Sequence, residues 1–320
     1  MANSSAELQK QAQIILDQVR TAVVGKDRVL LWVFAAILAR GHILLEDIPG
    51  VGKTTMALAF SKTLGLAQNR VQFTPDVLPS DITGYSILDP NRGTMVYQPG
   101  SVLCNLFLAD ELNRATSRTQ SALLEAMEEG QVTVDGVSHP IPKPFTVIAT
   151  QNPTGAAGTQ LLPDSQMDRF MVRLRMGYPD RKSEIAMVMN RQKKDPLKLL
   201  QPVISAQQLT DMQDAVAATY ISEELVDYVV ALIHASRTHE NISQGASPRA
   251  TLAVIAIAKA IACLRGRDYV VPADIREVLV VTLAHRLQLT PDAQARGILV
   301  DQVLGQIVKA VPAPSVIRNA

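Results

Sequence analysis

Apolar runs of strand length alternate with helical patterns through the part of the chain that ends near Pro179. The runs cover residues 42–45, 70–73, 103–109, 145–150 and 170–176. Between them, residues such as 54–64 and 119–129 carry apolar positions at helical spacing. Nearly continuous apolar runs are typical of strands buried on both faces, so the alternation predicts a doubly wound α/β domain around a parallel sheet. Residues 170–176 alternate with Arg173 and Arg175, which indicates an edge strand.

Helical patterns dominate both ends of the chain. Residues 7–24 and 26–39 form two such patterns, separated by Gly25. After Pro179 the strand signals fade, and several helical patterns begin with Ser or Pro start signals. These predicted helices cover residues 205–220, 222–238, 247–265, 272–287 and 291–308. We therefore expect an α/β core in residues 1–190 and an all-helical lid in residues 191–320, with a linker at residues 192–202.

Two segments interrupt the strand–helix alternation. Residues 85–100 contain a turn cluster followed by β-prone residues. Residues 131–141 predict a hairpin, because Asp135-Gly136 separates two β-prone stretches and Asp-Gly is a strong two-residue turn signal. Both are insertions in an α/β core, so we expect them to serve a purpose beyond nucleotide binding.

The segment of residues 44–55 carries the strongest chemical signal. An apolar strand leads into a Gly-rich turn, and Gly52-Lys53-Thr54 opens a helical pattern, as in a phosphate-binding P-loop. Backbone N–H groups of such a loop point at phosphate oxygens, Lys53 reaches the β- and γ-phosphates, and Thr54 places its hydroxyl on Mg²⁺. Asp47 stands where the pattern has its first Gly. The predicted nucleotide-binding residues here are Pro49, Gly50, Val51, Gly52, Lys53, Thr54 and Thr55.

Polar side chains end two of the predicted strands downstream. Asp110 and Glu111 follow the run 103–109, and Asn152 follows the run 145–150. Hydrolysis of ATP requires a carboxylate to hold Mg²⁺ and another group to orient and deprotonate the attacking water. We predict that Asp110 serves the metal ion, that Glu111 acts on the water, and that Asn152 contacts the γ-phosphate or the water.

Two arginines are candidates for stabilising the charge that develops on the phosphate. Arg169 follows a short helical segment, opposite the nucleotide edge of the sheet, and Arg249 opens a predicted helix of the lid. An arginine supplied by a neighbouring subunit raises phosphoryl-transfer rates by about 10³–10⁵ in known cases. Arg114, just after Glu111, is a third candidate on weaker grounds.

Composition excludes several other classes of protein. The net charge is +1 and aromatic residues do not interleave with basic ones, so no nucleic-acid surface is expected. Cys104 and Cys263 lie in apolar runs, which indicates buried cysteines of a protein in a reducing compartment. No signal peptide or transmembrane segment is expected, so the sequence predicts a cytoplasmic protein. The five histidines lack metal-ligand spacing.

Taken together, the motifs resemble the MoxR family of AAA+ ATPases over most of residues 20–290. The matching segments are residues 24–25, 49–54, 72–76, 78–81, 110–115, 149–153, 162–170 and 245–249. The resemblance implies Walker A at Gly50, Gly52, Lys53 and Thr54, Walker B at Asp110 and Glu111, sensor 1 at Asn152, the arginine finger at Arg169 and sensor 2 at Arg249. It also implies that Val24 and Gly25 pack near adenine. Residues 85–100 resemble the helix-2 insert of this family and residues 131–141 its pre-sensor-1 hairpin, which implies that both insertions face a ring pore or a partner.

The expected function is that of an ATP-hydrolysing motor with ATP and Mg²⁺ as cofactors, bound at the junction of core and lid. The resemblance implies a homo-oligomeric ring, most often a hexamer. It further implies chaperone-like remodelling of a partner protein, often one with a von Willebrand factor A (VWA) domain, sometimes to insert a metal cofactor. Two alternatives stay open: a slow-turnover ATP-dependent switch, and a DNA-directed motor, which the near-neutral charge disfavours.

Overall fold

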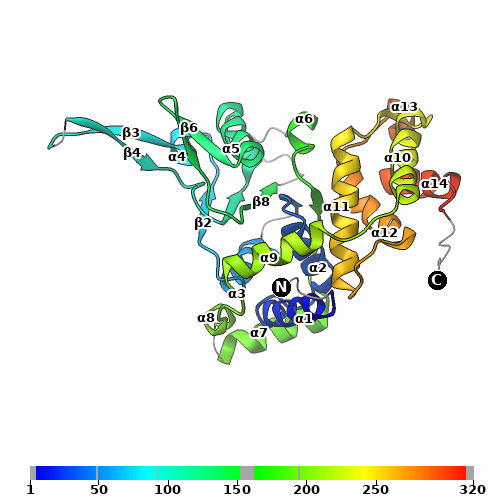
Figure 1. Cartoon of the computed structure of the whole chain (residues 1–320), viewed down its shortest axis with the longest axis horizontal. Coiled ribbons are helices and arrows are strands. Elements are labelled where there is room, and N and C mark those ends of the chain that lie inside the picture. The colour runs from blue at the N-terminus through cyan, green and yellow to red at the C-terminus, as the bar shows by residue number, and fades with distance from the viewer. Residues whose placement is uncertain (1–4, 48–49, 92, 152–161, 194, 315–320) are drawn as a thin grey trace.

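A five-stranded parallel sheet forms the centre of the molecule (Figure 1). The computed structural model describes residues 5–47, 50–91, 93–151, 162–193 and 195–314. The strand order is β2-β5-β8-β1-β9, so β9 lies at an edge as predicted. The strands are β1 (Ile43–Glu46), β2 (Gln68–Gln72), β5 (Leu106–Asp110), β8 (Thr146–Gln151) and β9 (Val172–Leu174). The predicted α/β class with a parallel sheet is confirmed.

Alternate residues of the central strands enter two separate cores. Ile43 and Leu45 of β1 pack with α1 (Ser5–Ala22), α2 (Asp27–Leu38) and α3 (Lys53–Thr63). Leu44 points the other way and packs with α5 (Ser117–Glu129). Side chains of a strand alternate between its faces, so apolar residues at every position bury both faces of the sheet. This is why β1, β5 and β8 are nearly continuous apolar runs.

Both predicted insertions are antiparallel hairpins. One pairs β3 (Gly84–Asp89) with β4 (Thr94–Pro99) after the short helix α4 (Pro79–Thr83), and it projects from the body of the molecule (Figure 1). The other pairs β6 (Gln131–Val134) with β7 (Val137–Pro140). Its turn residues Asp135 and Gly136 have φ values of 51° and 77°, as a two-residue hairpin turn requires. The rings of Tyr97 and His139 stack at 3.6 Å and join the two hairpins.

Helices form most of the chain after β9. They are α7 (Arg181–Lys193), α8 (Pro196–Leu199), α9 (Ala206–Ala217), α10 (Glu223–Thr238), α11 (Pro248–Leu264), α12 (Pro272–Leu283), α13 (Pro291–Ala295) and α14 (Val300–Ala310). A small antiparallel pair, β10 (Ile242–Gln244) and β11 (Gln288–Leu289), lies among them. The helices α11 and α9 pack against α2, and α11 also packs against α1, so the N-terminal helices and the C-terminal helices share one core. The predicted domain boundary at residue 190 falls within α7 and stays a prediction.

Two of the predicted helices end earlier than their apolar patterns suggested. The single helix predicted for residues 291–308 is two helices, because Gly297 adopts φ 71° after α13 and ends it. The helix predicted for residues 272–287 ends at Leu283, and residues 288–289 pair with β10 instead. In the described ranges, no helix combines the length and the apolar composition that crossing a bilayer requires.

Candidate nucleotide-binding site

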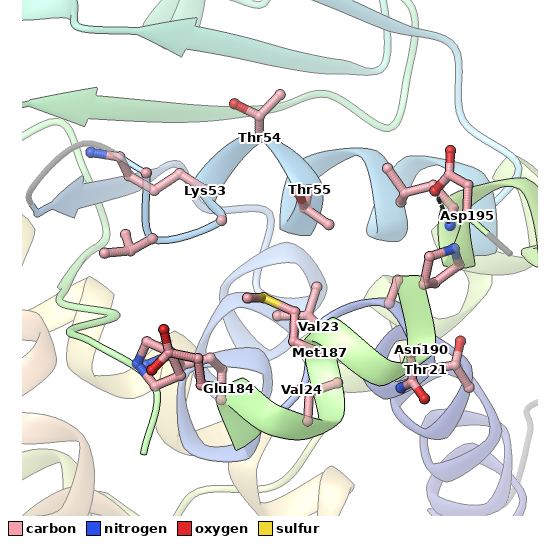
Figure 2. A pocket seen from close by; sticks show the side chains of 18 of the residues that line it. Thr21, Val23, Val24, Lys53, Thr54, Thr55, Glu184, Met187, Asn190 and Asp195 are labelled. Atoms are coloured by element: carbon pink, nitrogen blue, oxygen red, sulfur yellow. Dashed lines mark hydrogen bonds between the residues drawn. The ribbon is translucent and has the colours of Figure 1, made fainter. Parts of the chain in front are cut away.

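A cavity of about 650 Å³ opens at the carboxyl ends of the central strands (Figure 2). On one side lies the start of α3, with Thr54 and Thr55, and on the other lies α7, with Met187 and Asn190. The turn between α1 and α2 and the ends of β2 and β5 complete the wall. Ligands of open parallel sheets bind in the crevice outside the carboxyl ends of the strands, and this cavity has that location.

The turn that leads into α3 has the geometry of a phosphate-binding loop. Gly50 and Gly52 have φ values of 85° and 97°, in the left-handed region where glycine is favoured. α3 begins at Lys53, directly after Gly52, so its unpaired N–H groups and positive helix end lie beside the cavity. Six of the seven predicted loop residues line the cavity, whereas Pro49 lies outside the described residues.

The side chain of Lys53 is buried at the base of the loop. Its Nζ donates a hydrogen bond of 2.8 Å to the backbone oxygen of Asp47. Burial lowers the pKa of the Lys53 ammonium, and the carboxylates of Asp110, Asp47 and Glu111 oppose that shift. The ammonium is therefore held among acidic groups, and a phosphate chain would add the anionic partner that a cation at this place attracts.

Asp47, which replaces the first Gly of the P-loop pattern, has a structural partner. Its Oδ2 accepts a hydrogen bond of 2.6 Å from the backbone N–H of Gly177, just after β9. The ammonium of Lys26 donates to the backbone oxygens of Met176, Gly177 and Tyr178 at 2.8, 2.9 and 2.8 Å. The chain that enters α7 is thus tied both to the P-loop and to the start of α2.

Asp110 stands at the carboxyl end of β5 with both carboxylate oxygens engaged. Its Oδ1 accepts from the hydroxyl of Thr150 at 2.7 Å, and its Oδ2 accepts from Nη2 of Arg70 at 2.9 Å. The same Thr150 oxygen accepts from the backbone N–H of Glu111 at 2.8 Å. One residue of β8 therefore fixes both acids of the predicted Walker B pair.

Hard oxygen donors at the cavity fit a magnesium ion that is bound together with phosphates. Thr54 supplies a hydroxyl and Asp110 a carboxylate, and both line the cavity. Within the ranges that the structure describes, no cluster of three or more His, Cys, Asp or Glu side chains forms a metal site by itself. Mg²⁺ in nucleotide sites is typically held by one or two protein oxygens together with phosphates and water, which is the donor set available here.

Glu111 has an unusual backbone conformation. Its φ and ψ are 55° and 46°, in the left-handed region, and a 3₁₀ helix (Leu112–Arg114) follows it. A non-Gly residue in this region costs about 1–2 kcal/mol, and such strain clusters at functional sites. The carboxylate lines the cavity and pairs with Nη1 of Arg114 at 2.8 Å. Arg114, one candidate arginine finger, therefore lies beside the acid of its own chain.

The two other candidate arginines meet at a carboxylate outside the cavity lining. Arg169 pairs with Oε2 of Glu128 at 3.2 Å, and Arg249 pairs with Oε1 of the same carboxylate. Arg169 precedes the amino end of β9, whereas the P-loop follows the carboxyl end of the parallel neighbour β1. The structure thus brings Arg169 and Arg249 together at the edge of the sheet opposite the P-loop, and neither lines the cavity.

Asp168 attaches this edge to the C-terminal helices. Its carboxylate accepts from Nε of Arg286 at 2.7 Å and from the hydroxyl of Ser247 at 3.0 Å. Arg286 also donates to the backbone oxygens of Asp168 and Phe170, both at 2.9 Å. The same contacts between core and lid therefore hold the segments that carry Arg169 and Arg249.

The turn predicted to pack near adenine is in tight contact with α7. Val24 lines the cavity across from α3, and Gly25 has φ 72°. A Cβ atom added at Gly25 would lie 2.1 Å from Oγ and 2.5 Å from Cβ of Ser183, the third residue of α7. The absence of a side chain at Gly25 therefore lets α7 close over this end of the cavity (Figure 2).

We expect Gly25→Ala to displace α7 and weaken ATP binding by about tenfold, because overpacking and a left-handed Ala together cost about 1–3 kcal/mol. Calorimetric titration with ATP measures the loss. The variant Gly25→Ala/Ser183→Gly is the matched control, since it removes both Ser183 atoms that the new methyl group meets. The double variant should regain most of the affinity; equal weakness in both variants would exclude the contact with α7 as the cause.

Several cavity residues carry no signal that singles them out in the sequence. These are Thr21, Lys26, Arg70, Tyr178, Glu184, Met187, Asn190 and Asp195. No helix is predicted over the residues of α7. In the structure its apolar residues Ile185, Met187, Val188 and Met189 are exposed, so this helix buries no apolar stripe. One available signal is Asp180, whose carboxylate accepts from the backbone N–H of Ser183 at 2.7 Å, as a residue that caps a helix start does. Asn152 lies outside the described residues, so its predicted role stays a prediction.

These features define a P-loop ATPase of the AAA+ class. They are a parallel sheet with a P-loop, two acids at the end of a nearby strand, and a set of helices that follows the sheet. The family model "ATPase family associated with various cellular activities (AAA)" matches residues 42–172, and the "AAA lid domain" model matches residues 234–307.

Known proteins narrow this class to one family. The chain is 39% identical to Chaperone MoxR1 of Mycobacterium tuberculosis over 93% of this chain and 81% of that protein. It is 30% identical to Protein MoxR of Methylorubrum extorquens over 93% of each chain. A crystal structure of a candidate ATPase from Cytophaga hutchinsonii superposes with a TM-score of 0.91 at 36% identity, over 97% of each chain. The chain belongs to the MoxR family of AAA+ ATPases.

Proposed function

We propose that this protein binds ATP with Mg²⁺ in the cavity and hydrolyses it within a ring of identical subunits. The observation that carries the proposal is the convergence of Lys53, Asp110 and Glu111 on one cavity next to a glycine turn at a helix start. A binding module has use for the first two of these side chains, whereas hydrolysis also needs a group that orients and deprotonates the attacking water. Glu111 supplies such a carboxylate, and its left-handed backbone is the kind of strain that clusters at functional sites.

Each described side chain has a role in this proposal. The backbone N–H groups of Gly50–Gly52 and the Lys53 ammonium bind the phosphates. Thr54 and Asp110 hold Mg²⁺, which neutralises phosphate charge when it is bound. Glu111 orients the attacking water and accepts its proton, while Thr150 keeps Asp110 and Glu111 in register through the two hydrogen bonds described above.

Arg169 and Arg249 act on the nucleotide of a neighbouring subunit in this proposal. Both guanidinium groups lie at the edge of the sheet opposite their own P-loop, held in place by Glu128. Their side chains are partly exposed, at 31% and 43%, so they are accessible to a neighbouring chain. A ring in which this edge meets the next subunit's cavity completes every site, and such head-to-tail interfaces close into rings. The hexameric state is implied by the family.

The biological role proposed from the family is remodelling of a partner protein. The relative from M. tuberculosis is named a chaperone, and the hairpin β3–β4 exposes large apolar side chains. These are Tyr85, Ile87, Leu88 and Met95. Exposed apolar patches mark interaction sites. A partner with a VWA domain and insertion of a metal cofactor are the finer expectations from the family.

A slow-turnover switch is the second candidate function. It is favoured by the pairing of Arg114 with Glu111, which holds the water-activating carboxylate in an ion pair. A partner that draws Arg114 away would convert such a switch into a motor. A DNA-directed motor is disfavoured by the net charge of +1.

We expect the ATPase rate per subunit to rise with protein concentration and then saturate, because neighbours complete each site. Phosphate release measured from dilute to concentrated protein tests this. Lys53→Ala is the control. It should bind ATP about 100-fold more weakly, because it lacks a charge-assisted contact with the phosphates. Its turnover should stay at background at every protein concentration. A constant rate per subunit with ATP bound would favour the switch, and ATP binding unaffected by Lys53→Ala would contradict the proposed site.

A further inference from the structure

Arg70 is the one arginine of the described residues that lines the cavity, and the roles above leave it unused. We propose that Arg70 binds the terminal phosphate of ATP and thereby lets the protein distinguish ATP from ADP. This inference rests on the proposed function, because it assigns a further ligand to the same nucleotide site.

The sheet register places Arg70 beside the two acids. β2 pairs with β5 in parallel, with Gln72 opposite Asp110 and Arg70 opposite Leu108. The Arg70 side chain therefore extends along the strand toward the carboxyl edge, where its Nη2 donates to Oδ2 of Asp110 at 2.9 Å and to Oε1 of Gln72 at 3.3 Å. The guanidinium group lies at the end of the cavity that contains the predicted hydrolytic residues.

The guanidinium group has capacity for another partner. Only Nη2 is used, and Nε and Nη1 of Arg70 make no hydrogen bond with any residue in the part of the chain that the structure describes. An arginine carries five N–H donors in a planar fork that matches phosphate oxygens. The side chain is 47% exposed, so these donors are open to the cavity.

Asp110 does not need Arg70 as a structural partner. The Thr150 hydroxyl already donates to its Oδ1, and the Lys53 ammonium is close enough to interact electrostatically with it. The Arg70 side chain is 47% exposed while that of Asp110 is 11% exposed, so water screens the guanidinium end of this ion pair. The position of Arg70 is therefore better explained by the ligand than by the fold.

Geometry selects the terminal phosphate as the group that Arg70 contacts. Glu111 must lie beside the γ-phosphate to act on the attacking water. Asp110 precedes Glu111 in the chain, and Arg70 donates a hydrogen bond to Asp110, so Arg70 lies at the same end of the cavity. Two carboxylates next to a phosphate repel it, and a cation at that point offsets the repulsion. ADP lacks the phosphate that reaches this end, so its binding should depend little on Arg70.

The test compares AMP-PNP, a non-hydrolysable ATP analogue, with ADP, each with Mg²⁺, by calorimetric titration. Arg70→Ala should weaken AMP-PNP binding by about 10- to 100-fold, as expected for a lost charge-assisted hydrogen bond, and ADP binding by less than about threefold. Arg70→Lys should recover part of the AMP-PNP affinity, because it restores the charge without the fork. Arg118→Ala, at an exposed position of α5, is the matched control and should change neither affinity.

Equal weakening for both nucleotides, or no weakening for either, would overturn the assignment. Arg70→Gln, which keeps the hydrogen-bonding length without the charge, repeats the test if thermal unfolding shows that Arg70→Ala is destabilised. The proposed function fails separately: then the parent protein binds neither nucleotide, or Lys53→Ala binds both normally. The role of Arg70 alone would be rejected by a different set of results. In that case the parent binds both nucleotides and Lys53→Ala binds neither, while Arg70→Ala keeps the parent's ratio of AMP-PNP affinity to ADP affinity.

Discussion

Glu111→Gln should retain ATP binding and lose hydrolysis by a factor of about 10²–10⁴, the range for removal of a general base. The amide has nearly the size of the carboxylate but cannot accept the proton of the attacking water. The backbone N–H of residue 111 still donates to Thr150, so the strand end should keep its geometry. Steady-state phosphate release measures turnover, and calorimetric titration with ATP measures binding in the same preparation.

A matched variant separates this chemical effect from a general loss of negative charge. Glu125 is an exposed glutamate of α5, and Glu125→Gln changes the net charge in the same way. This variant should turn over at the parent rate. If Glu111→Gln retained more than about a tenth of the parent rate, the general-base role would be wrong, because a general base contributes about 10² or more. ATP-bound assemblies of Glu111→Gln should also be longer-lived in size-exclusion chromatography.

The sequence predicts the central sheet and the phosphate-binding end of the site because local rules determine both. The apolar runs of β1, β5 and β8 are continuous since both faces are covered, and few other structures place such runs between helical patterns. The turn at Gly50 and Gly52 needs left-handed backbone, which glycine supplies, and Lys53 then follows at a helix start. Each of these features is encoded within about a dozen residues.

The parts that escape prediction depend on residues distant in the chain. Arg70 lies forty positions before its partner Asp110, and only the pairing of β2 with β5 brings them together. The shared contact of Arg169 and Arg249 with Glu128 joins three separate segments. The place of α7 in the cavity wall depends on the close contact between Gly25 and Ser183, which are far apart in the chain. Tertiary packing, rather than periodicity, determines these positions.

The separation of Arg169 from its own P-loop leads to the second large effect. Arg169→Ala should still assemble, because its partner Glu128 remains paired with Arg249. Its ATPase rate should fall by about 10³–10⁵, the contribution of an arginine finger. When it is mixed with Lys53→Ala, part of the activity should return. In such a ring the Arg169→Ala subunit supplies an intact phosphate site and the Lys53→Ala subunit supplies Arg169. In an equal mixture that assembles at random, about one interface in four joins the two in the required order.

The same mixing experiment distinguishes the three arginines. Arg249 shares Glu128 with Arg169 at the edge opposite the P-loop, so Arg249→Ala should also be rescued by Lys53→Ala subunits. Arg114 pairs with Glu111 of its own chain, so Arg114→Ala should not be rescued, because the defect and the intact phosphate site would lie in the same subunit. Rescue of Arg114→Ala, with none for Arg169→Ala, would reverse the assignment. Arg114 would then be the residue that reaches a neighbour's nucleotide, and the contact of Arg169 with Glu128 would be structural.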